Sequence, residues 1–426
     1  MMTSVTSLGI SAFYHDSAAA IARDHEIVAA AQEERFSRRK HDPRFPRHAI
    51  DYCLGEAFLE PGELDAVIFY DDPLLTLDRV AQSALMAAPE GHGVFDDAAQ
   101  SLLRSKVWIE HIVEGALGTL GKTGRLLCAE HHMSHAASAF YPSPFQEAAI
   151  LTMDAVGEWA TTTLGFGAAN KIELLREVDY PHSIGLLYSA ITTFCGFKVN
   201  SGEYKLMGLA PYGQPVYYEA IRAHLIDVKE DGSFRLNMEY FAYMSQAVMT
   251  NDRFAALFGG PARAPESRIT RREMDLAASV QKITEEIVLL LARTARSITG
   301  AHDIVLAGGV ALNCVANGKL LRDGVFDRLW IQPAAGDAGG ALGAALLANH
   351  AYFERPRPQA DGRTDGQKGS YLGPGYSSRE VTAFLSGRGL PYEQVADADT
   401  RAGVIADVLV QGKIVGFFSG RMEFGP

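Results

Sequence analysis

Blocks of apolar and polar positions follow the same plan twice along the chain. Each time, three short apolar runs predict strands and are followed by segments of helical periodicity. The first three strands are expected at 4–13, 17–24 and 25–35, and the second three within 147–167 and 170–181. Units of strand, glycine turn and helix are expected at 302–321 and 328–350. Further strands are expected at 64–72 and 124–130, and helices at 46–57, about 75–121, 183–197 and 273–300.

This repetition predicts a duplicated α/β domain with a central nucleotide cleft, the organisation of the actin-like ATPases. A plain doubly wound sheet is the alternative, and it fits the antiparallel opening less well. The duplicated domain is expected to span 1–352, with halves at about 1–121 and 122–352. A proline- and glycine-rich polar stretch at 353–370 predicts a linker, and a new unit begins at 371–426.

Bulk properties narrow the functional classes. The length of 426 residues favours two to three domains. No run of about 18 apolar residues is present, and the N-terminus lacks the charged region of a signal peptide. Four widely spaced cysteines favour a reducing cytoplasm over a disulfide framework. A net charge of −12 argues against a nucleic-acid partner, and no membrane partner is expected.

The segment 128–145 contains the spacing of a helical metal site. His131 and His135 lie one turn apart on the predicted helix, so both imidazoles can reach one ion. Taken alone, such a pair is more often two ordinary helix histidines. Asp154 and Asp337 shift that balance, because each is a lone carboxylate in a glycine-rich turn after a strand. Two imidazoles and two carboxylates suit Fe(II), Mn(II) or Zn(II).

Two glycine-containing segments predict nucleotide contacts. Gly308 and Gly309 lie between a strand and a helix, where bare backbone can approach a phosphate. Asn313 and Asn317 follow one turn apart at the start of the helix, where both can contact a ligand. The alternative is a capped helix with these amides on its solvent-exposed face. The second segment, 200–213, is expected to be a loop, either a surface connection or one pressed against a ligand. In the ligand interpretation Lys205 faces an anion and Glu203 a ribose hydroxyl, and the further candidates are Gly208 and Gly157.

The first turn of the predicted cleft supplies candidate catalytic residues. His15 and Asp16 follow the first strand, where they can orient a hydroxyl or a phosphate. A basic segment at 35–46 contains Lys40, whose ordinary interpretation is a solvated loop and whose functional one is a ligand contact. We take His15, Asp16 and Lys40 as the catalytic candidates, with His15 as the base for an acceptor hydroxyl.

With these residues assembled, the chain resembles the O-carbamoyltransferases typified by nodulation-factor and antibiotic carbamoyltransferases. The resemblance rests on segments in family order: YHDSAAA, EERFSRRKHDPRFP, EHHMSHAASAFYPSPF, GEYKLMGLAPYG, AGGVALNCVANGKL, QPAAGDAGGALGAAL and SGRMEFGP. It implies an actin-like domain similar to that of the tRNA threonylcarbamoyl transferases, followed by an α+β YrdC-like domain. It also implies that iron is held by His131, His135, Asp154 and Asp337.

The same resemblance implies the reaction and its partners. ATP, with Mg, and carbamoyl phosphate would form carbamoyl-adenylate in the YrdC-like domain, and the actin-like domain would transfer the carbamoyl group to a hydroxyl of a sugar or natural product. A homodimer is possible. Arg421 alone represents the expected anion-binding arginines before Pro426, so 371–426 is interpreted as the incomplete start of the YrdC-like domain. Either the chain is shortened or a second polypeptide supplies the rest.

Two other functions compete with this one. A tRNA threonylcarbamoyl transferase-like enzyme would want a basic surface for tRNA, against which the net charge speaks. A non-catalytic actin-like regulator would bind nucleotide without a transition metal and would not need Asp337.

Overall fold

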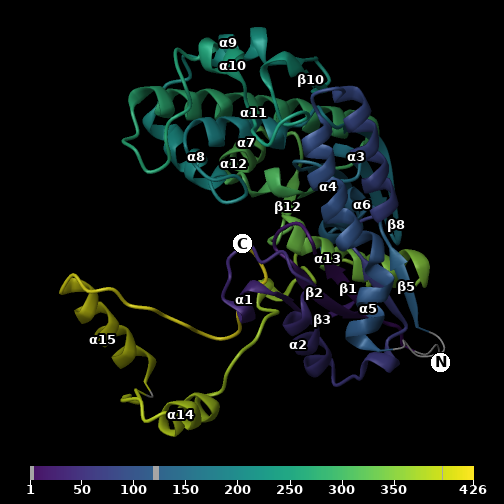
Figure 1. Ribbon diagram of the computed structural model, residues 1–426. Coiled ribbons are helices and arrows are strands. Elements are labelled where there is room, and N and C mark those ends of the chain that lie inside the picture. The colour runs from purple at the N-terminus through teal and green to yellow at the C-terminus, as the bar shows by residue number, and fades with distance from the viewer. Residues whose placement is uncertain (1–3, 119–123, 396) are drawn as a thin grey trace.

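Two five-stranded mixed sheets form the body of the protein, which the computed structural model describes over residues 4–118, 124–395 and 397–426 (Figure 1). Their strand orders are β3-β2-β1-β4-β5 and β8-β7-β6-β11-β12. In each sheet an antiparallel meander of three strands continues into two parallel strands. The matching order confirms the predicted duplicated α/β fold of actin-like type. The first sheet comprises β1 (Thr6–Ser11), β2 (Ala18–Arg23), β3 (Glu26–Gln32), β4 (Ala66–Phe69) and β5 (Arg125–Cys128). The second comprises β6 (Glu147–Met153), β7 (Ala160–Ala168), β8 (Lys171–Asp179), β11 (Asp303–Ala307) and β12 (Arg328–Ile331).

The strands that position the cleft are buried along their whole length, although β1 and β11 also contain polar residues. Every residue of β1, β4 and β11 is buried, because helices or the other half cover both faces of these strands. By contrast, β8 lies at a sheet edge and its residues are exposed or half-buried. The central strands therefore form a rigid base, and the residues that follow them are held at its edge.

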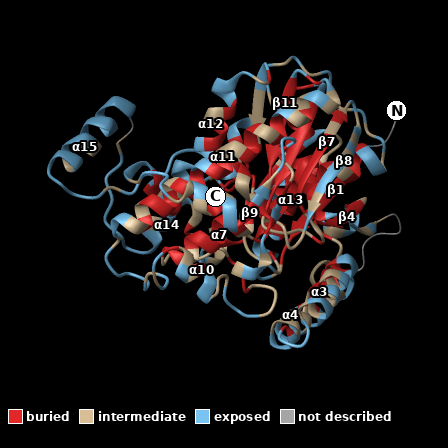
Figure 2. Cartoon of the chain, turned by 90° about the horizontal axis from the view of Figure 1, so that it is seen from above, coloured by how far each residue is buried: buried red, intermediate tan, exposed pale blue. Residues whose placement is uncertain are grey.

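Two helices rich in small residues lie between the sheets, and the second of them, α13 (Asp337–Leu347), is buried along almost its whole length (Figure 2). The first, α6 (His131–Phe140), packs against β6 and β11, whereas α13 packs against β1 and β2, and the two helices also pack against each other. The approach is close enough that a Cβ atom built at Gly343 would lie 1.8 Å from the carbonyl oxygen of Ser134. One built at Gly9 would lie 1.8 Å from that of Ala341. The glycines of this region therefore set the spacing between the two halves.

A helical insertion separates β4 from β5. The expected helical stretch at about 75–121 consists of α3 (Pro73–Ala87), α4 (His92–Arg104) and α5 (Ile109–Leu117). Residues 119–121 of that expectation lie outside the described residues. Strand β5, which the sequence pattern groups with the second half, pairs in parallel with β4. The two sheets therefore divide the chain after β5 rather than at 121, because the insertion delays the last strand of the first half.

The second half carries most of the remaining helices. The expected loop at 200–213 is instead mainly helical: α8 runs over Glu203–Leu209. Leu206 and Leu209, three residues apart, are both buried, and this helical spacing outweighs the glycines around it. The other helices are α1 (Glu34–Ser37), α2 (Arg47–Ala57), α7 (Ile184–Phe194), α9 (Tyr218–His224), α10 (Asp252–Leu257), α11 (Arg271–Thr299) and α12 (Cys314–Asp323). A two-stranded sheet, β9 (Ile226–Val228) and β10 (Phe234–Leu236), completes this half.

The segment after α13 is anchored to the body before it leaves it. Within the predicted linker, the Arg357 guanidinium donates hydrogen bonds to the backbone carbonyls of Phe140, Tyr141, Ser143 and Phe145. The chain then departs near Gly375 and returns at Arg421, where the two residues form a β-bridge. Between them α14 (Ser378–Gly387) and α15 (Ala398–Val410) lie away from the body and bury no residue (Figure 1).

Across the described residues, no helix combines the length and the apolar character needed to cross a membrane.

Candidate active site and metal centre

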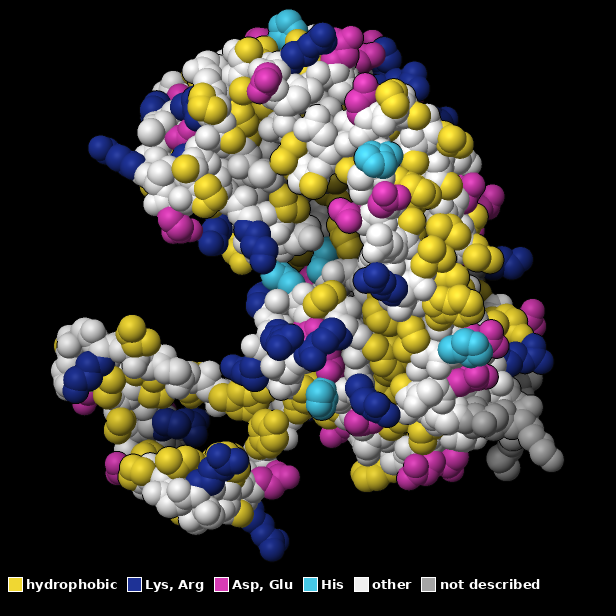
Figure 3. Space-filling model, in the orientation of Figure 1, with side chains coloured by type: hydrophobic (Ala, Val, Ile, Leu, Met, Phe, Trp, Pro, Cys, Tyr) yellow, Lys and Arg dark blue, Asp and Glu magenta, His cyan; other side chains and the backbone are white. Residues whose placement is uncertain are grey.

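A cavity of about 550 Å³ lies in the cleft between the two halves. Figure 3 shows histidine and acidic side chains gathered in this hollow. Of the residues predicted from sequence, seven line it: His15, Asp16, Lys40, Asp154, Glu203, Gly309 and Asn313. They come from loops after β1, α1, β6 and β11 and from the starts of α8 and α12, so both halves contribute.

The four predicted metal ligands converge beside this cavity. One ligand atom from each of His131, His135, Asp154 and Asp337 can be chosen so that all four lie within 4.8 Å of one another. The Nε2 atoms of His131 and His135 are 3.0 Å apart, and they lie 3.0 and 3.2 Å from Asp154 Oδ2. His131 Nε2 is 3.8 Å from Asp337 Oδ1. All four side chains are buried.

Local structure aims each of the four groups. The two histidines occupy one face of α6, Asp154 directly follows β6, and Asp337 is the first residue of α13. The Asp154 carboxylate also accepts the Gly309 backbone N–H at 3.2 Å, which ties it to the turn after β11. The Tyr70 hydroxyl lies 3.5 Å from Asp337 Oδ2, and its ring contacts the His131 ring edge-to-face.

Burial and the neighbouring charges shift the pKa values of the histidine and aspartate side chains in the cluster. Burial alone would lower the pKa of His131, but the hydrogen bond with Asp154 and the charges of Asp337 and Asp154 raise it to about 9. Burial alone would raise the pKa of Asp154, yet the hydrogen bonds with the two histidines hold it well below its usual range. His132 faces away from these ligands: its Nδ1 contacts the Thr152 hydroxyl at 2.6 Å, and burial keeps its pKa low.

This donor set fits a transition-metal cation. Without an ion, the proton that the raised pKa keeps on His131 links the two Nε2 atoms and Asp154, and two buried carboxylates face this single positive charge. Buried charged groups are stable only when they are paired or coordinate a metal ion, and one cation would satisfy all four groups at once. A mixed set of imidazole and carboxylate ligands favours Fe(II), Mn(II) or Zn(II) over Ca(II).

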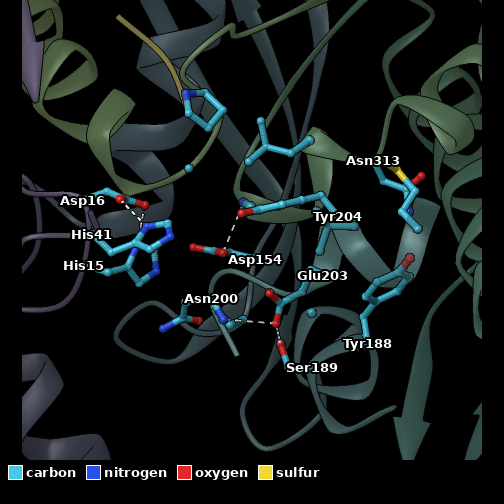
Figure 4. Close-up of a pocket in the computed structure, with 18 of the residues that line it drawn as sticks. His15, Asp16, His41, Asp154, Tyr188, Ser189, Asn200, Glu203, Tyr204 and Asn313 are labelled. Carbon is cyan, nitrogen blue, oxygen red and sulfur yellow. Dashed lines mark hydrogen bonds and ion pairs between the residues drawn. The ribbon is translucent and has the colours of Figure 1, made fainter. Parts of the chain in front are cut away.

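A second polar group lies at one side of the cavity (Figure 4). The Asp16 carboxylate bridges two imidazoles, at 2.9 Å from His15 Nδ1 and 2.7 Å from His41 Nδ1. His15 Nε2 is then directed towards the metal-ligand cluster, 3.9 Å from Asp337 Oδ2. Burial would lower the pKa of His15, but the Asp337 charge and the hydrogen bond with Asp16 raise it to about 9. Lys40 is paired with Glu34 at 3.1 Å and borders the cavity.

The other side of the cavity is more apolar. Val310, Leu312, Met207 and the aromatic ring of Tyr188 line it. Its polar groups are fixed by hydrogen bonds: Glu203 accepts from the Ser189 hydroxyl at 2.8 Å, and the Asn313 and Gln281 amides bond reciprocally at 2.9 and 3.0 Å. Figure 4 shows Glu203, Tyr188 and Asn313 across the cavity from His15 and Asp16. An apolar wall with few oriented polar groups is typical of a small-molecule pocket.

Comparison with protein-family models places most of the chain in one family. The model described as "Carbamoyltransferase N-terminus" matches residues 6–346, which contain both sheets and every residue of the metal-ligand cluster. The chain belongs to the carbamoyltransferase family.

Similar proteins are longer than this carbamoyltransferase-family chain. An uncharacterised protein of Synechocystis is 53% identical over 426 residues, covering 98% of this chain and 69% of the relative. The nodulation protein NolNO of Sinorhizobium fredii is 34% identical and is matched over 97% of this chain and 57% of its own length. The solved structure of HypF from T. kodakarensis has 16% identity and a TM-score of 0.42, covering 82% of this chain and 48% of that one. That likeness is too weak to bear on function.

Six predicted ligand contacts of this family member lie outside the cavity lining. Lys205 and Gly208 are exposed on α8, because a helix replaces the expected loop. Gly308 packs against β6, where a Cβ would lie 2.2 Å from the Met153 carbonyl oxygen, and Gly157 packs against His131 and His132. Asn317 donates to the Ala311 carbonyl at 2.7 Å, and Arg421 pairs with Glu56 at 2.9 Å. Of the six, Gly157 and Gly308 pack close to the metal-ligand cluster and to β6.

Tyr188 and Ser189 also line the cavity, but they lie within an ordinary helical segment and carry no recognisable signal in the sequence. Asn200, Tyr204 and Met207 belong to the candidate segment 200–213, although they were not among its predicted contacts. His41, which also lines the cavity, had a partial signal because it belongs to the basic segment around Lys40. Glu158, which contacts the start of α6 rather than the cavity, follows the candidate Gly157 in the turn after Asp154.

Proposed function

We propose that this chain carries the carbamoyl-transfer site of an O-carbamoyltransferase. Supporting it is one observation above the others: in a chain of the carbamoyltransferase family, a buried cluster of two histidines and two aspartates borders the cavity of the interdomain cleft. A binding module without chemistry has no need for such a cluster. A metal ion held by these donor groups suits a reaction in which negative charge develops on a carbonyl or phosphate oxygen.

His131, His135, Asp154 and Asp337 would hold the metal, with iron the ion suggested by the family resemblance and Mn or Zn the alternatives. When bound, such an ion supplies Lewis-acid stabilisation of negative charge on oxygen. The proposal also assigns a binding site to the carbamoyl donor. The apolar side around Tyr188 and Met207 would take the adenine of carbamoyl-adenylate, and Glu203 would accept a hydrogen bond from a ribose hydroxyl.

The reaction would be an acyl-type substitution. The acceptor hydroxyl oxygen forms a bond to the carbamoyl carbon, the bond from that carbon to the phosphate oxygen breaks, and AMP leaves with the bonding pair. The hydroxyl proton would pass to Nε2 of neutral His15, because an ion bound by Asp337 would offset the negative charge that raises the His15 pKa. The hydrogen bond of Nδ1 with Asp16 directs Nε2 towards the cluster. Lys40 at the cavity edge would attract the phosphate. ATP with Mg and carbamoyl phosphate would supply the adenylate through a YrdC-like domain that begins at about residue 371.

Product analysis tests this function. The iron-loaded chain is incubated with synthetic carbamoyl-adenylate and a panel of sugars and hydroxylated natural products, and mass spectrometry detects addition of one carbamoyl group. We expect AMP release and a carbamoylated product from at least one acceptor class, and loss of both in Asp337→Asn. Carbamoylation at an equal rate in Asp337→Asn, or no binding of the adenylate by the wild type, would contradict the proposal.

A further inference from the structure

Glu158 occupies an unusual position next to the proposed metal centre. It lies four residues after Asp154 in the turn between β6 and β7, and its side chain is buried. Its carboxylate accepts the His131 backbone N–H at 2.9 Å through Oε1 and 3.1 Å through Oε2. Oε1 also accepts the Asp72 backbone N–H at 2.7 Å. Both carboxylate oxygens are thus engaged by N–H groups, and Glu158 is not among the four residues whose donor atoms converge.

The first of these bonds fixes the start of the metal-binding helix. His131 is the first residue of α6, and its N–H is one of those a helix cannot satisfy internally. The residue before it, Glu130, makes no side-chain capping bond. Glu158 supplies the cap from a distant part of the chain, and a carboxylate there also complements the positive end of the helix. The backbone that carries the His131 imidazole is therefore held by Glu158.

The second bond connects the same carboxylate to the helical insertion. Asp72 immediately precedes α3, and its own side chain caps that helix by accepting the Leu74 N–H at 2.8 Å. The adjacent Trp159 donates from Nε1 to the Asp78 carboxylate, one and a half turns into α3, at 3.2 Å. The turn that follows Asp154 thus forms hydrogen bonds both with the helical insertion of the first half and with α6, which carries the two histidine ligands.

We propose that Glu158 is a positioning residue that holds His131 in the geometry needed for the ion and couples the filled metal centre to the start of α3. The inference rests on the metal site of the proposed function. It extends the set of functional residues beyond the ligands themselves, since partners that orient a ligand contribute to metal affinity. It also gives the insertion a mechanical connection to the reaction centre.

Conservative and non-conservative variants separate this role from a general one in folding. Glu158→Gln keeps an oxygen that can accept both N–H groups, whereas Glu158→Ala removes the acceptor. Glu130→Gln is the matched control, because it removes a carboxylate at the same helix end that caps nothing. Each metal-free protein is titrated with Co(II), whose visible absorption reports ligand geometry, and the exchange of α3 backbone amides is measured with and without the ion.

We expect Glu158→Ala to weaken Co(II) binding by about 10- to 100-fold and to change its absorption spectrum. Glu158→Gln should retain a spectrum close to that of the wild type and most of the affinity, and Glu130→Gln should match the wild type. The ion should slow amide exchange at 74–76 in the wild type but not in Glu158→Ala.

Three results would overturn the inference. The first is wild-type affinity and spectrum in folded Glu158→Ala. The second, which stays informative if the alanine variant does not fold, is a Glu158→Gln protein that loses the ion as completely as a ligand variant does. The third is exchange at 74–76 that the ion leaves unchanged in the wild type. A wild type that binds no Co(II) at all would remove the metal site of the proposed function as well, so the two failures are distinguishable.

Discussion

Two groups of side chains border the same cavity and both bring possible metal ligands together, yet they differ in what already neutralises them. In the first group, His131, His135, Asp154 and Asp337 face one another. In the second, which consists of Asp16, Glu34 and His41, the donors also lie within 4.8 Å. The carboxylates of the first group need a metal cation to balance their charge, whereas those of the second group are already paired with basic side chains.

The partners of the second group explain the difference. Glu34 is paired with Lys40 at 3.1 Å and Arg35 at 3.2 Å and accepts the His41 backbone N–H at 2.8 Å. Asp16 is engaged by two imidazoles, as Asp154 is in the first group, so the contrast lies between Glu34 and Asp337. The Asp337 carboxylate oxygens lie 3.8 Å from His131 Nε2 and 3.9 Å from His15 Nε2. A metal ion there would have to displace two basic side chains. Proximity of acidic and imidazole groups is therefore a weak sign of a metal site unless their charges are left uncompensated.

Removing a ligand from each group should give the largest contrast. His135→Ala takes away one of two imidazoles of the first group, and we expect metal affinity to fall by more than about 100-fold, since loss of even an outer-shell partner costs 10- to 100-fold. His41→Ala in the second group should bind the ion as the wild type does. Elemental analysis after anaerobic purification measures both, and a loss of metal in His41→Ala would show that we have assigned the groups wrongly.

Removing only a charge should have a smaller effect. Asp337→Asn keeps the size of the side chain and one ligating oxygen, so we expect affinity to fall by about 10- to 100-fold. Glu34→Gln removes a carboxylate of the second group and should change affinity by less than about 10-fold, the smallest loss expected from removal of a partner that orients a ligand. Competition with a chelating dye gives both affinities. Equal losses in the two variants would mean that the overall negative potential, not the four ligands, attracts the ion.

The ion should stabilise the folded chain through the first group alone. At a free-ion concentration of 100 Kd, binding to the native state adds about 2.7 kcal/mol to the free energy of unfolding. The increase in Tm on adding the ion should be present in the wild type and in His41→Ala and absent in His135→Ala. A Tm increase of the same size in His135→Ala would place the stabilising ion elsewhere.

The smallest expected effect is a pH dependence of the metal-free protein. The pKa of His131 is raised to about 9 in the folded chain, above the ordinary value of 6.5. The stabilisation from the charged imidazole is therefore complete below about pH 6.5 and is lost as the pH rises through 9. Urea unfolding of the metal-free wild type should show this decline, and His131→Gln should lose that part of it. Identical pH profiles for the two proteins would refute the assignment.

Sequence reasoning was most successful where a residue type and the local pattern carry the same information. The opening meander was predictable because its strands are apolar runs separated by polar turns, and β1, β2 and β3 fall within the predicted ranges. The His131–His135 spacing and the isolated carboxylates Asp154 and Asp337 were recognisable for a similar reason: each is chemically conspicuous in its segment.

The rest depends on contacts between distant segments. The glycines of 200–213 suggested a loop, but the burial of Leu206 and Leu209 against the second half stabilises α8 and turns Lys205 outward. Glu158 looks like a turn residue in sequence, and only the fold brings the starts of α3 and α6 to its carboxylate. No local pattern specifies such a meeting point.

Anomalous X-ray diffraction from crystals grown with Mn(II) or Fe(II) tests the central claim most directly. We predict one strong anomalous peak within coordination distance of His131 Nε2, His135 Nε2 and the carboxylates of Asp154 and Asp337, and none between Asp16, Glu34 and His41. A peak at the second group, or ordered density without any peak among the first four residues, would contradict the account.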